Sequence, residues 1–260
     1  MMCGYGVPKS DLAHYLCSPS NSLTVWGDQG DINIAADYGA AALFMIYMAD
    51  HFGGAALISH LLRNQITGEA GITAALAELG HWQWTFPMVF KAWRLTNLIR
   101  AETPGSGLYN YISIDLDDIQ PLTINRYAPK SGMVSRSAFL GPTYSLEGYD
   151  TGVDTVAAYS VDYYSVDAFG SLSKIDHRVV FEGANEADQS VPTSDGNVDF
   201  SVTMYFPATS RLTARITDVP IYHASETGMR YLAWFAGYTE AYILISPNEG
   251  PVDYQFGVVQ

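Results

Sequence analysis

The side chains of this sequence best suited to metal binding or proton transfer are its six histidines. A zinc hydrolase typically takes two ligands from histidines one helical turn apart, in a His-Glu-x-x-His motif, and a third from further along the chain. Neither that motif nor a pair at i and i+4 occurs among His14, His51, His60, His81, His177 and His223. His51 and His60 flank a predicted helix junction, where surface or capping roles are favoured. The sequence therefore predicts no metal site made from its own histidines.

Other patterns that carry chemistry are equally weak. No Gly-x-Ser-x-Gly elbow, phosphate-binding loop or Gly-x-Gly-x-x-Gly after a strand appears. The acidic stretches Asp115–Asp118 and Ser194–Phe200 could place carboxylates around calcium, but neither matches the twelve-residue calcium loop with its terminal glutamate. We therefore interpret both stretches as loops whose acidic side chains are solvated. Trp234 and Tyr238 could line a carbohydrate or peptide groove, but aromatic residues alternating along a strand more often belong to the core.

The charge of the chain narrows the class of partner. The formal net charge is -14, and residues 101–260 carry -12 of it, with 20 acidic and 8 basic side chains. Such a surface repels nucleic acid, so we exclude that partner. The low lysine content beside abundant Ser, Thr, Asp and Tyr is typical of a secreted or cell-surface protein, although an adaptation to high salt would give the same composition.

The cysteines and the apolar runs bear on the compartment. Cys3 and Cys17 could form a disulfide in an oxidising compartment, and two free thiols fit equally well. The first ten residues lack the basic and apolar regions of a signal peptide. The longest apolar run, Ala40–Ala49, is far shorter than the roughly 20 residues of a membrane span. We expect a soluble chain with no membrane span.

Helices are predicted for the first part of the chain. Asp31 or Asn33 could cap the first helix, which ends at Gly53-Gly54 and has apolar residues on nearly every side, so we expect it to be surrounded by neighbours. One face has the i, i+3, i+4, i+7 spacing, and the other is apolar too: Tyr38, Ala41, Met45, Met48 and Phe52, then Leu43, Phe44, Ile46 and Tyr47. Three further helices are expected over about Ala55–Asn64, Ala70–Leu79 and Pro87–Ala101.

After Thr103–Gly107 the period changes to that of strands. Short segments rich in β-branched and aromatic residues alternate with Gly, Pro, Asn, Asp and Ser: "LYNYISI", "DTVAAYSVDYYSV", "HRVVFEG", "VDFSVTMYF", "RLTARITDV", "MRYLAWFAGY", "EAYILIS" and "YQFGVV". Many short strands at this spacing are typical of an antiparallel sandwich or jelly roll. The predicted fold is therefore α+β, with a helical lobe over residues 1–105 and a jelly-roll-like antiparallel β-sandwich over 106–260.

The string "DYGAAALFMIYMADHFGGAALISHLLRNQITGEAGITAALAELG", Asp37 to Gly80, resembles the helical lobe that follows the zinc site in gluzincin metallopeptidases, and hyicolysin-like families in particular. In these families a tyrosine and a glycine open a buried helix, a glycine follows it, and a segment similar to "GITAALAELG" comes next. "SLTVWGD", Ser22–Asp28, looks like the linker before this helix, and "FPMVFKAWRLTNLI" like the helix that closes the lobe. The likeness covers about the first 100 residues and extends to the remainder only in style.

The resemblance implies a role for one residue and the absence of others. In gluzincins, a phenol or imidazole from this lobe donates a hydrogen bond to the oxyanion of the transition state, and Tyr38 is the matching position. The competing interpretation is a core tyrosine that anchors the start of the helix. The family's zinc ligands belong before Met1, so this chain is expected to hold no zinc and no other cofactor, with zinc present only in a full-length relative.

The predicted function is therefore the C-terminal portion of a secreted, metallopeptidase-like hydrolase that is truncated and inactive on its own. Whether it counts as an enzyme stays open. In a full-length relative the substrate would be a peptide or protein, and the partner of this chain would be the catalytic half or a second copy. An apolar patch near residues 1–50 is then expected. The alternative is an extracellular β-sandwich module that binds glycan or protein.

Overall fold

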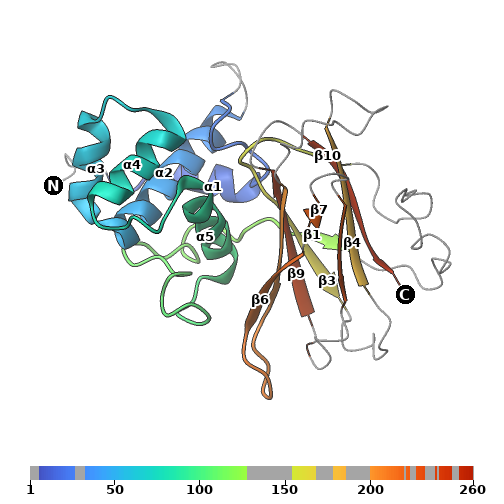
Figure 1. Ribbon diagram of the computed structural model, residues 1–260. Coiled ribbons are helices and arrows are strands. Elements are labelled where there is room, and N and C mark those ends of the chain that lie inside the picture. Colours follow the sequence, from blue (N-terminus) through green and yellow to red (C-terminus); the bar gives the residue numbers. More distant parts are fainter. Residues whose placement is uncertain are drawn as a thin grey trace. The chain divides into compact units, whose positions relative to one another are not determined.

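The structure of the protein is a computed structural model that describes residues 6–26, 33–127, 154–167, 178–185, 200–219, 221–222, 227–231, 238, 240–247 and 252–259. It divides into two compact units, Met1–Thr123 and Ile124–Gln260. Within the described residues, the first unit holds five helices and the second holds ten strands (Figure 1). The protein therefore belongs to the α+β class, as the sequence predicts.

The helices are α1 (Lys9–Cys17), α2 (Ile34–Phe52), α3 (Gly54–Arg63), α4 (Gly68–Glu78) and α5 (Phe86–Ile99). The last four match predicted segments, whereas α1 was not predicted. Gly53 ends α2 with a φ of 125°, a conformation that favours glycine. The Thr73 hydroxyl accepts the Phe86 amide at 3.1 Å, which holds the start of α5 on α4. Among the described helices, none is long and apolar enough to span a membrane.

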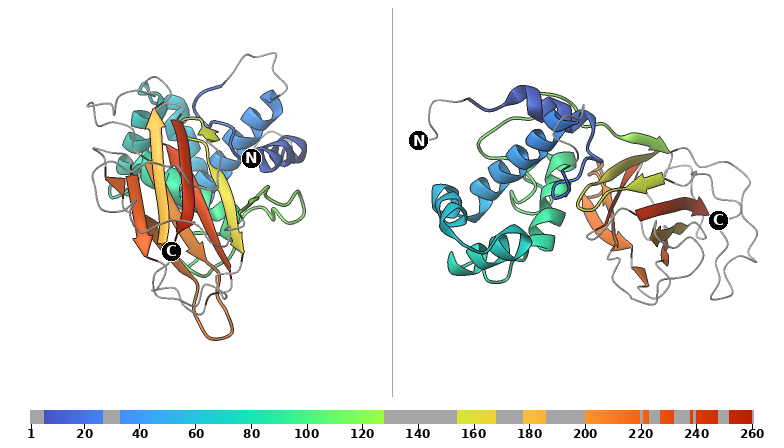
Figure 2. Two further views of the ribbon diagram at one scale, coloured as in Figure 1. Left: turned by 90° about the vertical axis from the view of Figure 1, so that its right-hand side faces the viewer. Right: turned by 90° about the horizontal axis from the view of Figure 1, so that it is seen from above.

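Helices α1 and α2 pack at very short range because of one glycine. A Cβ atom on Gly39 would lie 2.0 Å from the carbonyl oxygen of Asp11 and 2.9 Å from the Cβ of Tyr15. No other residue fits without moving a helix. The contact buries the apolar face of α1, formed by Leu12, Tyr15 and Leu16, and the two helices lie side by side in both views of Figure 2.

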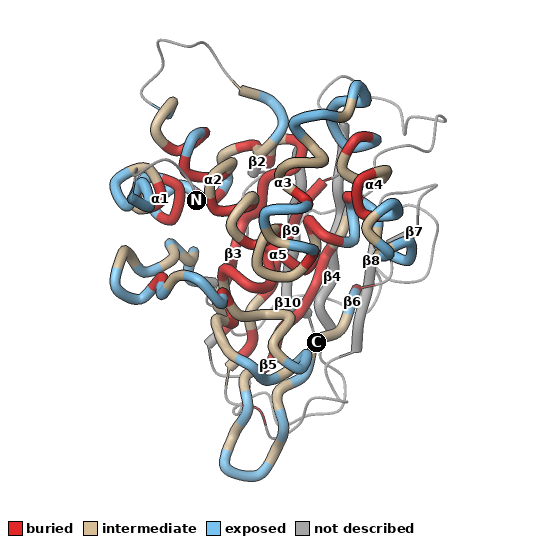
Figure 3. The backbone as a smooth tube through the Cα atoms, turned by 90° about the vertical axis from the view of Figure 1, so that its left-hand side faces the viewer, coloured by how far each residue is buried: buried red, intermediate tan, exposed pale blue. Residues whose placement is uncertain are grey.

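Helix α2 is buried along one stripe rather than on all sides as predicted. The stripe follows the helical period and consists of Ala36, Asp37, Gly39, Ala40, Leu43, Phe44, Tyr47, Met48 and Phe52. The residues between them, including Ala41, Met45 and Ile46, are half-buried, and Tyr38 is exposed. Figure 3 colours the backbone by these burial classes. The apolar character of the whole helix therefore exceeds what its described neighbours cover.

Helix α5 supplies the centre of the helical core. Trp93 is almost fully buried, and its ring lies 5.5 Å from that of Tyr15, 5.3 Å from that of Phe44 and 5.7 Å from that of Phe90. These rings come from α1, α2 and α5, so one aromatic cluster joins three helices. Stacked and edge-to-face aromatic pairs at these separations stabilise a core beyond the area they bury.

Residues 106–123 continue the helical unit, whereas the sequence assigned them to the β domain. The predicted strand "LYNYISI" forms turns and bends. Its backbone amides at Ile112 and Ser113 donate to the carboxylate of Asp50 at 2.8 and 3.1 Å, and the Tyr111 hydroxyl donates to Asn97. Side chains of α2 and α5 thus hold this segment, in place of a neighbouring strand.

The strands of the second unit are β1 (Asn125–Tyr127), β2 (Asp154–Val156), β3 (Asp162–Asp167), β4 (Arg178–Asn185), β5 (Phe200–Phe206), β6 (Arg215–Val219), β7 (Ile221–Tyr222), β8 (Thr227–Tyr231), β9 (Glu240–Pro247) and β10 (Val252–Val259). They form one sheet of order β1-β3-β9-β5-β6 and another of order β2-β10-β4-β8-β7. Strand β1 pairs with β3 in parallel, and every other described pairing is antiparallel.

The first sheet has an apolar face set by its register. Ile245 of β9 lies between Asp162 of β3 and Val202 of β5, and Ile243 lies between Tyr164 and Met204. Every second residue along a strand faces the same side, so these side chains share one face. The isoleucines, Val202 and Met204 are at most 1% exposed. This face is a hydrophobic core of the β unit.

Two predictions about individual segments are resolved in this unit. The single stretch "DTVAAYSVDYYSV" forms two strands, because a turn containing Tyr159, with a φ of 47°, separates β2 from β3. Tyr238 is 6% exposed, packs against Phe206 and donates its hydroxyl to the Thr213 carbonyl at 2.6 Å. The prediction that Tyr238 belongs to the core is confirmed, whereas Trp234 lies outside the described residues.

Candidate functional site

The residue that the sequence places in a functional role, Tyr38, lies at the start of the second turn of α2. Its side chain is 48% exposed, so the interpretation as a buried core anchor is wrong. The Trp26 ring contacts it edge to face at a centroid distance of 5.2 Å. The phenol is therefore accessible to a ligand, while the ring that carries it has a defined neighbour.

The backbone around Tyr38 is held by polar contacts. Asp37 is 6% exposed, and its carboxylate accepts a hydrogen bond from the side-chain amide of Asn21 at 2.5 Å. The buried hydroxyl of Ser22 accepts the backbone amides of Thr24 and Val25 at 3.2 and 2.9 Å. Together these bonds fasten the segment before Trp26 to the start of α2. Such support is what a side chain needs to act as an oriented donor.

Three large apolar residues are exposed in the part of the chain where an apolar patch is expected, near residues 1–50. Val7, Val25 and Tyr38 are 41%, 61% and 48% exposed. Isolated exposed apolar residues are ordinary on a protein surface. These three residues therefore do not by themselves define the expected patch.

The residues considered for metal binding do not come together. Among the residues that the structure describes, no three His, Cys, Asp or Glu side chains are grouped so that they could hold a metal ion. Asp115, Asp117 and Asp118 are exposed, and Asp117 pairs with Arg100 at 2.9 Å. The described residues therefore do not fit a zinc or calcium site. Ser194–Asp199, His177 and His223 lie outside the described residues, as does Cys3; Cys17 is exposed.

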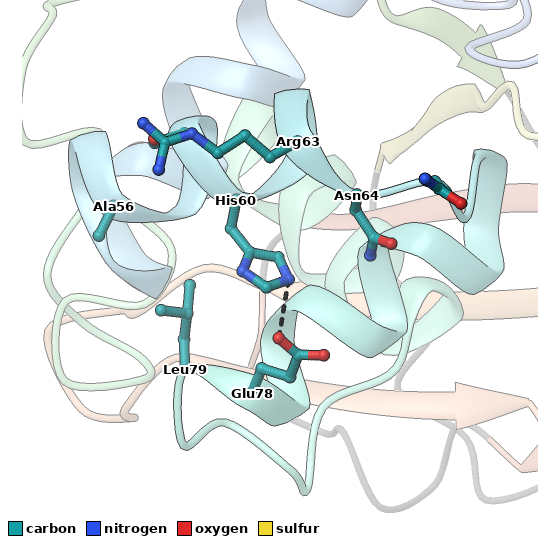
Figure 4. Close-up of a pocket in the computed structure, with 8 residues that line it drawn as sticks. Ala56, His60, Arg63, Asn64, Glu78 and Leu79 are labelled. Atoms are coloured by element: carbon teal, nitrogen blue, oxygen red, sulfur yellow. Dashed lines mark ion pairs between the residues drawn. The ribbon is translucent and has the colours of Figure 1, made fainter.

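His51 lies in the last turn of α2 and His60 in the last turn of α3, and the two have different surroundings. His60 forms an ion pair with Glu78 of α4, with Nε2 and Oε2 at 3.1 Å, at an open pocket of about 510 Å³ (Figure 4). Arg63 and Asn64 belong to the same pocket. His60 is thus a surface group, as expected. An exposed pair of this kind contributes little to stability, about 0–1 kcal/mol.

His51 contributes to a second pocket, which sequence reasoning missed. Its Nε2–H donates to the Asn110 carbonyl at 2.8 Å, and its ring lies 4.7 Å from the Tyr47 ring. The pocket has a volume of about 420 Å³ and is lined by His51, Phe52, His81, Trp84, Glu102, Ser106, Gly107, Leu108, Asn110 and Ile112. Because these residues come from three separate segments, no local motif could have revealed it.

Beneath this pocket lies a buried tyrosine, Tyr47, which contacts the Tyr111 ring at 6.2 Å. Burial raises the pKa of the Tyr47 phenol well above its ordinary value. The phenol therefore stays neutral under all ordinary conditions and acts as part of the core. Among the tyrosines of α2, only Tyr38 is accessible enough to meet a substrate.

Neither known protein-family models nor curated proteins give a match to this chain.

Proposed function

We propose that residues 1–123 are the C-terminal helical lobe of a secreted, zinc metallopeptidase-like protein, similar to the hyicolysin-like gluzincins, and that this lobe contributes a tyrosine and no metal ligands. The observation that carries the proposal is the exposure of Tyr38. It is the residue that matches the family's hydrogen-bond donor, and it is exposed at the start of a helix whose neighbouring residues, Asp37 and Gly39, are buried.

In this proposal Tyr38 acts on the substrate by donating its phenolic O–H. Negative charge develops on the carbonyl oxygen of the scissile bond only in the transition state, so a donor held in position lowers the barrier without tightening substrate binding. The contact with Trp26 and the hydrogen bond between Asn21 and Asp37 support that position. The zinc ligands belong to the partner half, and the isolated chain is inactive.

The partner of the lobe is then the catalytic half. Val7, Val25 and the half-buried face of α2 provide the apolar surface for it. A second copy of this chain is the alternative occupant. Sedimentation velocity of the isolated chain distinguishes the two, because self-association at micromolar concentration favours the second copy, and a monomer favours the catalytic half.

The DNA that precedes the codon for Met1 provides the first test of the proposal. An in-frame His-Glu-x-x-His followed by a downstream glutamate codon supports it, and an unrelated reading frame contradicts it. Metal analysis and a peptidase assay on the isolated chain provide the second test. We expect neither bound zinc nor activity; one zinc per chain that is lost on replacing histidines would refute the proposal.

In the protein that contains both halves, we expect Tyr38→Phe to lower kcat about 100-fold, the loss typical of removing one oxyanion donor, with little change in KM. Tyr242→Phe is the matched control, since its hydroxyl donates to Glu240 within the β unit. Equal activity of Tyr38→Phe and wild type would contradict the role of Tyr38.

For the β unit, the proposed fold is a jelly-roll sandwich. Apart from the edge strands β1 and β7, strand β2 pairs with β10, β3 with β9, β4 with β8 and β5 with β6. This nested pairing is the pattern of two Greek keys wrapped into two sheets. Residues of β2 approach β9, and residues of β6 approach β8, as a sandwich requires. A crystal structure with the two sheets side by side would contradict it.

This strand pairing also favours a second function, because jelly rolls occur in lectins. The β unit would then be an extracellular module that binds glycan or protein. Glycan-array binding that is unchanged by Tyr38→Phe supports this function. Absence of binding across the array would contradict a glycan-binding function and leave the metallopeptidase-like function as the proposal.

A further inference from the structure

The pocket at the end of α2 has the composition of a site for a positively charged group. Its walls carry four rings, those of His51, Phe52, His81 and Trp84. The Phe52 ring lies 5.1 Å from the Trp84 ring and 5.4 Å from the His81 ring, both edge to face. The negative faces of aromatic rings attract cations, and tryptophan attracts them most strongly.

The charged residues that line the pocket also favour a positively charged ligand. Glu102 is the only carboxylate among its lining residues, and neither lysine nor arginine lines it. The nearest basic residue in sequence, Arg100, donates to the Asp117 carboxylate at 2.9 Å and to the Asn97 carbonyl at 2.9 Å. Because Arg100 has these acceptors, Glu102 keeps its charge available to a ligand.

The wall that carries Glu102 is preformed. The Gly107 amide donates to the Glu102 carbonyl at 2.8 Å, and the Ala101 amide donates to the Tyr109 carbonyl at 3.1 Å. On the opposite side, the bond from His51 to the Asn110 carbonyl fixes the last turn of α2 against this segment. A pocket that is already ordered spends little free energy on ordering when it binds a ligand.

We propose that this pocket binds an alkylammonium group, the end of a lysine side chain or of a free alkylamine, with the ammonium between the Trp84 ring and the Glu102 carboxylate. The aliphatic stem of the ligand lies against Leu108 and Ile112, which supply apolar surface. A volume of about 420 Å³ lies within the range of small-molecule sites, about 300–1,000 Å³.

The site is independent of the proposed role of Tyr38. His51 and Tyr38 are 13 residues apart on one helix, which separates them by about 20 Å along its axis. Loss of function at one position therefore leaves the other intact, and the two proposals fail separately.

The test is a ligand titration of the full chain at pH 8, where ordinary imidazoles are neutral. Binding is monitored through the NMR chemical shift of the Trp84 indole N–H. The probe is Nα-acetyl-lysine N-methylamide, and the comparison ligand is the norleucine derivative, which has a similar stem without charge. We expect saturable binding of the lysine derivative and at least about tenfold weaker binding of the norleucine derivative. Butylamine forms a third arm; equal binding assigns the site to a free amine, and weaker binding assigns it to lysine in a peptide.

Variants complete the test by calorimetric titration with the lysine derivative. Trp84→Leu and Glu102→Gln should each weaken binding about tenfold. Trp82→Leu and Asp118→Asn are the matched controls, because both residues are exposed and neither lines the pocket. Circular dichroism verifies that each variant is folded. Equal binding of the lysine and norleucine derivatives, or unchanged binding by Glu102→Gln, would overturn the proposal.

Discussion

Helices α2 and α5 show that the apolar content of a helix and its burial are different properties. Helix α2 is apolar on nearly every side, yet only 9 of its 19 residues are buried. Helix α5 includes Arg94, Thr96 and Asn97, and 10 of its 14 residues are buried, these three among them. Burial is therefore set by the neighbours of a helix, here the aromatic rings of α1 and α2 that pack on Trp93.

The two helices also differ in their roles, because α5 contributes to stability and α2 carries side chains that are accessible to a ligand. Helix α5 carries the packing core, and most of its side chains are buried there. Helix α2 carries the accessible Tyr38 at its start and His51 of the second pocket near its end. A helix with apolar surface beyond what its neighbours cover is suited to contact another molecule. Both proposed sites accordingly include residues of α2.

The largest expected effect comes from the core of α5. We expect Trp93→Ala to lower the free energy of unfolding by about 3–5 kcal/mol, because it leaves a cavity among the rings of Tyr15, Phe44 and Phe90. Urea denaturation monitored by circular dichroism measures the change. Trp82→Ala, at a residue 79% exposed, should change it by less than about 0.5 kcal/mol. Similar losses in the two variants would contradict the assignment of the core.

A smaller effect is expected where α1 crosses α2. Gly39→Ala places a methyl group 2.0 Å from the Asp11 carbonyl oxygen, so one helix must shift. Overpacking of this kind costs about 1–3 kcal/mol. The midpoint of thermal unfolding should fall accordingly. Gly6→Ala is the control, since no atom lies within 4 Å of its added methyl group. If Gly39→Ala matched wild type, the close crossing of α1 and α2 would be refuted.

The smallest effect at neutral pH is expected at Tyr47. Burial raises the pKa of its phenol, so the group contributes stability below the ordinary pKa of 10 and loses it as the pH rises further. The unfolding free energy of wild type should therefore fall more steeply above pH 10 than that of Tyr47→Phe. Tyr38→Phe, at an exposed residue, should retain the steep fall. Parallel profiles for wild type and Tyr47→Phe would show that the phenol is solvated.

Periodicity and glycine punctuation were enough to predict much of the fold. The ends of α2 and α4 agree with the predicted ends because Gly53 and Gly80 follow them, and most described strands overlap predicted segments, with β1 and β7 the exceptions. Helix α1 was missed because its apolar face is only Leu12, Tyr15 and Leu16, too short for a clear period. The segment "LYNYISI" was mistaken for a strand, because the acceptor of its amides, Asp50, is distant in sequence.

The candidate sites were less accessible to sequence reasoning. Resemblance selected Tyr38, but its exposure depends on which side of α2 meets α1 and α5, and two apolar faces left that choice open. The second pocket combines the end of α2, the segment before α5 and the segment after it. None of these has a motif, and only the tertiary fold brings Trp84 and Glu102 into one cavity.

The outer strands of the two sheets affect the tendency of the protein to aggregate at high concentration. Of the described strands, β1, β2 and β7 are outermost and only two or three residues long, and β6 carries the exposed charges of Arg215 and Asp218. Short or charged margins give a passing chain few free amides and carbonyls to pair with. The described margins of both sheets therefore offer little template for strand addition between chains, the step by which sheet proteins grow into fibrils.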